Sequence, residues 1–133
     1  MRLAAFKDDK NKVENGVWEE IADGLMVRVA SLDNDAYTKI VLDNVDKIGK
    51  AKKNKNTLSA IRDAEKIMCR ALASSVLLDW KNLQDDDGND IGYSEDKAFE
   101  ILFEHKRFRD AVLEIAKNES LYYAEVKEEQ EKN

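Results

Sequence analysis

Residues 58–80, LSAIRDAEKIMCRALASSVLLDW, contain the longest run of regularly spaced apolar side chains in the chain. These side chains recur every three or four positions from Leu58 to Trp80, which is the spacing that places them on one side of an α-helix. The polar residue Thr57 precedes the run, and an acidic stretch with two glycines follows it. The pattern therefore predicts one long core helix over residues 58–80.

Three further helices are expected around this one. Upstream, residues 35–48 carry apolar side chains at helical spacing, followed by the polar segment 49–56, GKAKKNKN, which we expect to be a solvated link. Downstream, Ser94 is a suitable N-cap for a helix ending near His105. A last helix is expected from about Arg107, with Phe108, Ala111, Val112, Ile115 and Ala116 facing inward.

A β-hairpin is expected near the N-terminus. The apolar-rich runs 17–21 and 25–29 are separated by Ala22-Asp23-Gly24, and Asp-Gly between two such runs is a strong turn signal. In the second run Leu25, Val27 and Val29 alternate with more polar neighbours, so one face can be buried. We assign Trp18 and Trp80 to the core, since large aromatic side chains at such positions usually pack.

The fold class predicted is a mainly α, small helical domain of about four helices with an N-terminal β-hairpin. The 133 residues include five glycines and no proline, so the chain lacks the commonest helix breaker. This length fits a single domain, 1–133, because it leaves no room for a second core. Within it we expect a hairpin at about 13–30, a helical body at about 35–124 and an exposed or disordered charged tail at 125–133.

Composition and charge exclude several classes of protein. The formal net charge is -6, so we expect no general binding to nucleic acid. Residues 57–133 hold 11 basic and 18 acidic side chains, whereas residues 1–56 hold 11 and 10, so the second half supplies the negative excess. One cysteine cannot form an internal disulfide. No apolar run approaches the roughly 20 residues that span a bilayer, and no convincing signal peptide is present, so we expect no membrane association and a cytosolic location.

A search for catalytic or metal-binding groups finds little. The single histidine, His105, lies at a helix junction, and Cys69 lies beside the apolar stripe, so a capping role and a core role are favoured over catalysis. The acidic stretch 85–96 does not fit an EF-hand loop in either glycine register. The lysines over 47–55 could contact phosphate, but a solvated link is favoured because no aromatic residues are interleaved. We therefore expect no enzyme, cofactor or metal, and a binding or assembly role.

Two segments resemble the tail assembly chaperones of long, non-contractile-tailed bacteriophages. Residues 72–118, LASSVLLDWKNLQDDDGNDIGYSEDKAFEILFEHKRFRDAVLEIAKN, show a helix ending in Asp-Trp, an acidic glycine turn and a Tyr-Ser helix start. Residues 14–41, ENGVWEEIADGLMVRVASLDNDAYTKIV, are similar to the opening of the same family. Gly92 stands where family members often have a proline. The signature turn contains Asp79, Trp80, Asp86, Gly88 and Tyr93.

The resemblance implies a non-enzymatic assembly factor that binds the tape measure protein and keeps it soluble until tail tube subunits polymerise around it. Such a protein acts in the host bacterial cytoplasm and is absent from the finished virion. The family also implies a longer frameshifted form that recruits tail tube protein. On this reading the chain is a monomer or weak oligomer. The alternative is a structural virion component, such as a tail completion or head-tail joining protein.

Exposed apolar or aromatic groups outside the predicted core are the natural candidates for partner binding. We select four: Phe103, Leu121, Tyr122 and Tyr123. The competing interpretation is that these side chains close the back of the core.

Overall fold

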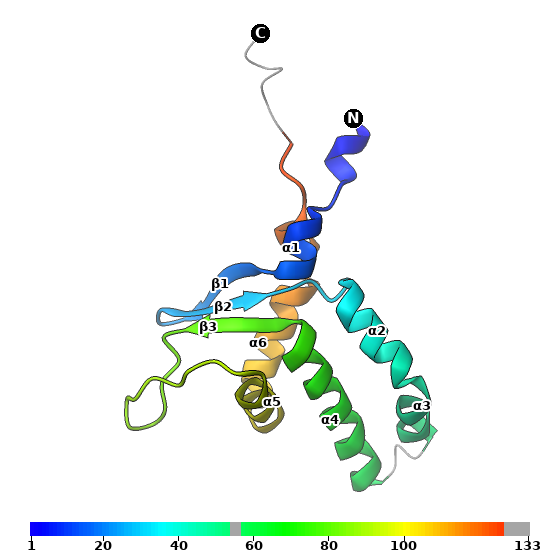
Figure 1. Ribbon diagram of the computed structural model, residues 1–133, viewed down its shortest axis with the longest axis vertical. Helices are drawn as coiled ribbons and strands as arrows, with labels where there is room; N and C mark the ends of the chain where they lie inside the picture. Colours follow the sequence, from blue (N-terminus) through cyan, green and yellow to red (C-terminus); the bar gives the residue numbers. More distant parts are fainter. Residues whose placement is uncertain (54–56, 127–133) are drawn as a thin grey trace.

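The structure is a computed structural model that describes residues 1–53 and 57–126. It contains a three-stranded antiparallel sheet in the order β1-β2-β3, with helices packed beside and beneath it (Figure 1). The strands are β1 (Val17–Ala22), β2 (Leu25–Val29) and β3 (Leu77–Lys81). The α-helices are α1 (Lys10–Asn15), α2 (Asp35–Asp43), α3 (Val45–Lys53), α4 (Leu58–Ser75), α5 (Glu95–Glu104) and α6 (Lys106–Lys117). Two 3-10 helices are η1 (Leu3–Phe6) and η2 (Glu119–Tyr122).

The described residues therefore form a small mixed α/β domain. The prediction of a mainly α domain with about four helices and only a hairpin is wrong, because a third strand and additional helices are present.

The third strand replaces the end of the predicted long helix. Helix α4 stops at Ser75, whose hydroxyl donates 2.6 Å to the Ala71 carbonyl, a side-chain bond that competes with helix continuation. The following Val76-Leu77-Leu78 segment has β-favouring residues, and Leu77–Lys81 pairs with β2. Asp79 and Trp80 thus lie on a strand and not at a helix end. The predicted helix is correct only from residue 58 to 75.

The predicted first helix, 35–48, is divided in two. Asn44 separates α2 from α3, and its side-chain amide donates 2.8 Å to the Ile40 carbonyl at the end of α2. Helix α3 then continues through Lys53, so residues 49–53 of the expected link are helical. The remaining link residues, 54–56, lie outside the described residues.

The N-terminal hairpin is confirmed. Asp23 and Gly24 form its two-residue loop with φ values of 49° and 83°, and Ala22 pairs with Leu25 across it. Positive φ at both loop positions is the I′ geometry that favours Asp-Gly. The boundary at about residue 13 is wrong, because Lys10–Asn15 forms α1, which the Asp9 side chain caps by accepting from the Lys12 amide.

Helices α5 and α6 match their predicted positions. The Ser94 hydroxyl oxygen accepts 3.1 Å from the Lys97 amide, as a capping serine should. Helix α5 ends at Glu104, and α6 begins directly after His105. On α6, Val112 and Ala116 are buried, whereas Phe108, Ala111 and Ile115 are half-buried.

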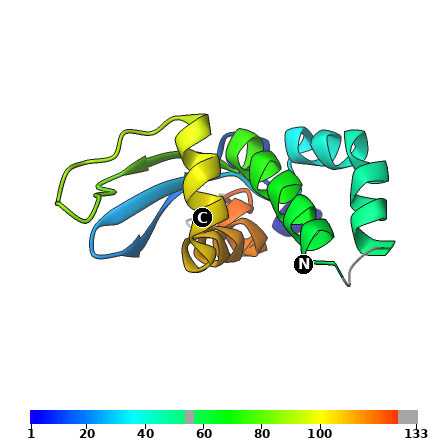
Figure 2. The same ribbon diagram turned by 90° about the horizontal axis from the view of Figure 1, so that it is seen from below.

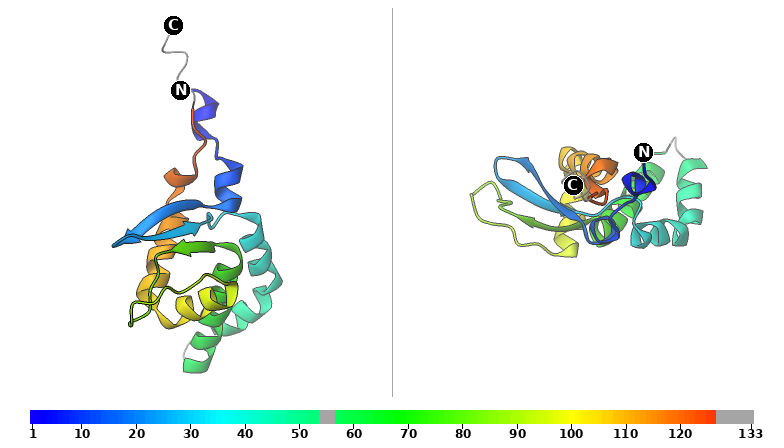
Figure 3. Two further views of the ribbon diagram at one scale, coloured as in Figure 1. Left: turned by 60° about the vertical axis from the view of Figure 1, so that its left-hand side comes forward. Right: turned by 90° about the horizontal axis from the view of Figure 1, so that it is seen from above.

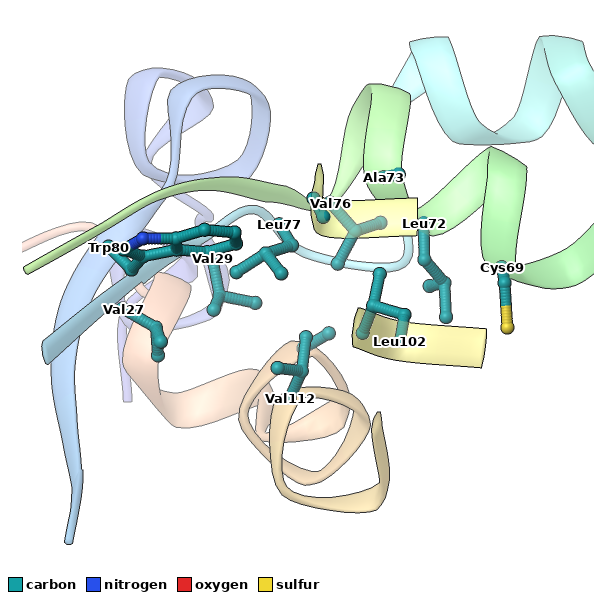
Figure 4. Close-up of a cluster of buried hydrophobic side chains, with 12 residues drawn as sticks. Val27, Val29, Cys69, Leu72, Ala73, Val76, Leu77, Trp80, Leu102 and Val112 are labelled. Atoms are coloured by element: carbon teal, nitrogen blue, oxygen red, sulfur yellow. The ribbon is translucent and has the colours of Figure 1, made fainter. Parts of the chain in front are cut away.

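The main core lies between one face of the sheet and helices α4, α5 and α6 (Figure 4). Val27 pairs with Trp80 across the sheet and Val29 with Leu77, so all four side chains share the covered face. The helices meet this face with buried apolar side chains, among them Leu72, Leu102 and Val112. Helix α5 crosses beside α4, while α2 and α3 lie on the other side of α4 (Figure 2).

The opposite face of the sheet carries polar side chains. Trp18, Arg28 and Asp79 occupy consecutive paired positions across the three strands. Trp18 is half-buried there, with the Lys81 ammonium 4.3 Å from its ring centroid. Our assignment of Trp18 to the core is therefore wrong, while that of Trp80 is right.

The two ends of the described chain lie side by side above the sheet (Figure 3). The Asp9 amide donates 2.8 Å to the Tyr122 carbonyl, and the Ala124 amide donates 2.9 Å to the Lys7 carbonyl. Of the predicted charged tail, Glu125 and Val126 are exposed, and residues 127–133 lie outside the described residues.

Candidate partner-binding groove

The signature turn performs a structural task in this molecule. The Trp80 indole N–H donates 2.7 Å to the Ile91 carbonyl, and its ring meets Tyr93 edge-on at 4.9 Å between centroids. The Tyr93 hydroxyl donates 2.8 Å to the Leu77 carbonyl, and burial raises its pKa above the ordinary value. These bonds hold the loop between β3 and α5 against β3.

The acidic part of that loop is closed by its own backbone. One Asp85 carboxylate oxygen accepts from the amides of Asp87 and Asn89, at 3.0 and 2.9 Å. Asp86 is exposed, and Gly88 has a φ of 84°, which favours glycine. Within residues 1–53 and 57–126, no group of three or more His, Cys, Asp or Glu side chains is arranged to hold a metal ion.

The four predicted partner-binding residues do not form one surface. Phe103 on α5 is half-buried and stacks on Phe99, with ring centroids 5.9 Å apart. Leu121 is half-buried in a hollow bounded by β1 and α6. Tyr123 is exposed.

Tyr122 belongs to the core. Only 2% of it is exposed, and its hydroxyl donates 3.0 Å to the Val29 carbonyl. Burial raises its pKa far above the ordinary value. For this residue the structure fits the competing interpretation, in which it closes the back of the core.

The chain does contain an apolar groove, formed by α2, α3 and α4. It has a volume of about 450 Å³, and Glu65 is the one charged side chain among the described residues that line it. We call this the α2–α4 groove. Its walls are Tyr37, Ile40 and Val41 from α2, Ile48 from α3, and Ile61, Ala64, Glu65, Ile67, Met68 and Ala71 from α4.

The sequence sets the walls at an angle by capping and breaking the helices. The Asn34 side-chain oxygen accepts 2.8 Å from the Tyr37 amide and so starts α2, and the break at Asn44 turns the chain into α3. The Thr57 hydroxyl oxygen accepts 3.2 Å from the Ala60 amide and starts α4. Together α2 and α3 form an arm that lies along α4, apart from the sheet (Figures 1 and 2).

Large apolar side chains are also exposed on the three helices that form the groove. Leu42, Val45, Leu58 and Ile61 are between 44% and 67% exposed. Helix α2 has no buried residue, although its Tyr37, Ile40 and Val41 are half-buried at the groove. An accumulation of exposed apolar groups beside an apolar groove is typical of a surface that binds another protein.

Glu65 connects the groove to the core. Its carboxylate lies 3.4 Å from the guanidinium of Arg109, a buried side chain of α6 that also donates 3.2 Å to the Leu102 carbonyl. Arg109 further contacts the sulfur of Cys69 at 3.5 Å. Burial raises the pKa of the Cys69 thiol, so this buried cysteine is less ready to form a thiolate. Cys69 therefore fits the predicted core role.

The sequence predicts amphipathic helices over 35–48 and 58–80, which include most of the groove residues, but it does not single them out as a binding surface. The helical spacing of Tyr37, Ile40, Val41 and Ile48 correctly indicates one apolar face. A periodic pattern cannot say whether another element covers that face. The relevant additional signal is the lysine-rich composition of residues 47–55 directly beside it, which is unusual for a helix that enters a core.

Among the described parts of the chain, no helix combines the length and apolar character required to cross a bilayer.

Comparison with known proteins gives a match to a family model. A family model described as YdaY prophage protein matches residues 32–133, which include α2 to α6, β3 and therefore the whole groove. Neither a curated protein nor a solved structure matches the chain. The matched region covers most of the chain and is phage-derived. The chain thus belongs to the YdaY prophage protein family.

Proposed function

We propose that this chain is a phage tail assembly chaperone that holds an apolar helical segment of the tape measure protein in the α2–α4 groove. The observation that carries the proposal is the groove itself, with its almost wholly apolar lining and the exposed leucine, valine and isoleucine side chains on the same helices. Membership of a phage-derived family and the resemblance of the signature turn support the tail-assembly context.

The physical task of such a chaperone is reversible covering of apolar surface. A tape measure protein is a long helical chain, and its apolar stripes aggregate when they are exposed to water. An amphipathic helix laid in a groove buries those stripes through side-chain contacts at i, i+3, i+4 and i+7. Tail tube subunits can then displace the chaperone by burying the same stripes in a larger interface.

The proposal also specifies where the chain acts and whether it remains in the virion. The chain acts without catalysis in the host cytoplasm and leaves before the virion is complete. Its net charge of -6 helps to keep the complex dispersed. Recruitment of tail tube protein by a longer frameshifted form is part of the same scheme.

Co-expression with tape measure fragments from the same prophage tests the proposal. Wild-type chain is expected to keep at least one fragment soluble and to retain it in a pull-down. Ile61→Glu places a charge on the groove wall and is expected to reduce recovery at least tenfold, about 1.4 kcal/mol of binding free energy. Val126→Glu is the matched control, since Val126 has similar exposure, 45%, outside the groove.

Two results would count against the proposal. Equal recovery with wild type and Ile61→Glu would show that the groove is not the binding surface. Mass spectrometry that finds the chain at a fixed copy number in purified particles would favour the alternative of a structural virion component.

A further inference from the structure

The α2–α4 groove lies in a basic region of an acidic protein. Residues 35–71, which contain α2, α3 and α4 up to the end of the groove, hold nine Lys and Arg against five Asp and Glu. The rest of the chain holds 13 against 23. Comparing the two halves of the sequence hides this difference, because the basic region crosses their boundary.

Helix α3 is the most basic wall of the groove. Its sequence VDKIGKAKK contains four lysines and one aspartate, and its Ile48 lines the groove. Lys47, Lys50 and Lys53 are exposed, and within the described ranges none of them forms an ion pair. Lys47 is next to Ile48 in the sequence, at the side of α3 that lines the groove, whereas Lys50 is two positions beyond Ile48 and so lies on the opposite side of the helix.

A second hollow beside α4 also combines apolar and basic side chains. It has a volume of about 270 Å³ and is lined by Ile40, Asn44, Lys66, Ile67, Arg70 and Phe99. Ile40 and Ile67 line both hollows, so the two are neighbours. In the second hollow Arg70 lies 4.0 Å from the Phe99 ring centroid and pairs with Asp96 at 3.2 Å, whereas no described carboxylate pairs with Lys66.

We propose that the occupant of the α2–α4 groove is an amphipathic helix with acidic side chains flanking its apolar stripe, and that Lys47 and Lys66 contact those carboxylates. The inference rests on the proposed function and specifies the chemistry of the segment that is held. Apolar contacts supply the affinity, and complementary charge selects the segment and speeds its association. The acidic remainder of the chain repels a carboxylate-rich segment elsewhere, which directs it to this surface.

Three labelled 18-residue peptides test the inference by fluorescence anisotropy. The first is a helix with a leucine stripe and flanking glutamates, the second has lysines in place of the glutamates, and the third is a scrambled form of the first. At low salt the glutamate helix is expected to bind at least tenfold more tightly than either of the others. Its affinity is expected to fall as salt is raised, because screening weakens exposed charge pairs.

Charge reversal in the protein provides a second test. The double variant Lys47→Glu and Lys66→Glu is expected to weaken binding of the glutamate helix at least tenfold and to improve binding of the lysine helix. The double variant Lys10→Glu and Lys117→Glu, with the same change in net charge at exposed sites on α1 and α6, is expected to bind as wild type does. Circular dichroism establishes that both variants are folded.

Failure of this inference is separable from failure of the proposed function. Equal binding of the glutamate and lysine helices, or no binding of the glutamate helix, overturns the inference, while a tape measure fragment that is still held leaves the proposed function standing. Equal binding of the scrambled peptide also overturns it, since charge alone would then suffice. If the labelled glutamate helix is released as the protein concentration is raised, a second copy of the chain competes for the groove. That result would identify self-association instead and would overturn the inference.

Discussion

The α2–α3 arm and the body of sheet, α5 and α6 are built from similar amphipathic elements but bury them very differently. On α4, which borders both regions, the buried residues are Cys69, Ala71, Leu72, Ala73 and Ser75, all in the half next to the sheet. No described side chain of α2 or α3 is buried. The body completes its own core, whereas the arm leaves its apolar stripe half covered. That difference is why we propose that the interaction surface lies on the arm.

The largest expected effect concerns the body. Leu102→Ala removes a fully buried side chain from the core, and we expect the free energy of unfolding to fall by about 2–5 kcal/mol. Leu42→Ala on the arm is the control, because Leu42 is 65% exposed and its loss should change stability by no more than about 0.5 kcal/mol. Urea denaturation of both variants measures the difference. Similar losses for both would contradict the division into two regions.

Asn34, at the junction of the two regions, is expected to have the next largest effect. Besides capping α2, its amide donates to the Ser31 carbonyl and, at 3.0 Å, to the Ser75 carbonyl at the end of α4. Asn34→Ala therefore removes a cap and two buried bonds, and should cost about 2–3 kcal/mol. Ser94→Ala, which removes only the exposed N-cap bond of α5, should cost about 1 kcal/mol. Equal costs in urea denaturation would show that the junction bonds contribute nothing.

Tyr122→Phe should have a smaller effect that depends on pH. Loss of the bond to the Val29 carbonyl is expected to cost about 0.5–1.5 kcal/mol near pH 7. Because burial raises the folded-state pKa above the ordinary value of 10.0, the unfolded state releases the phenolic proton first, and wild-type stability should fall as pH rises above 10. The variant should lose less stability over that range. Parallel stability curves for the two proteins would refute this role.

Local signals in the sequence are sufficient for some elements. The Asp23-Gly24 turn defines the hairpin, and Ser94 marks the start of α5, because the turn and cap geometries depend on neighbouring residues alone. The end of α4 could not be predicted in this way. Val76 and Trp80 continue the helical spacing of the preceding residues, whereas the pairing of Leu77 with Val29 joins residues far apart in the sequence, which no local pattern contains.

The candidate groove likewise could not be predicted from local sequence patterns. The apolar stripe on 35–48 was visible, but its incomplete burial depends on the turn at Asn44 and on how α3 lies against α4. The four residues selected for exposure did not locate the groove, since exposure also depends on tertiary contacts. Tyr122 illustrates this, because the strand β2 accepts its hydroxyl.

The smallest expected effect is unchanged amide protection in α3 of the Leu102→Ala variant. It is the most direct test of the difference between the arm and the body. Because the arm has little buried apolar surface, its amides should exchange with solvent through local opening and not through global unfolding. In Leu102→Ala, amide protection in β2 should therefore fall by the factor that corresponds to the lost unfolding free energy, while protection in α3 should stay within about twofold of wild type. Hydrogen exchange followed by NMR measures both regions in one sample. If protection in α3 falls in step with that in β2, the arm unfolds only with the body, and its half-covered stripe belongs to one cooperative unit.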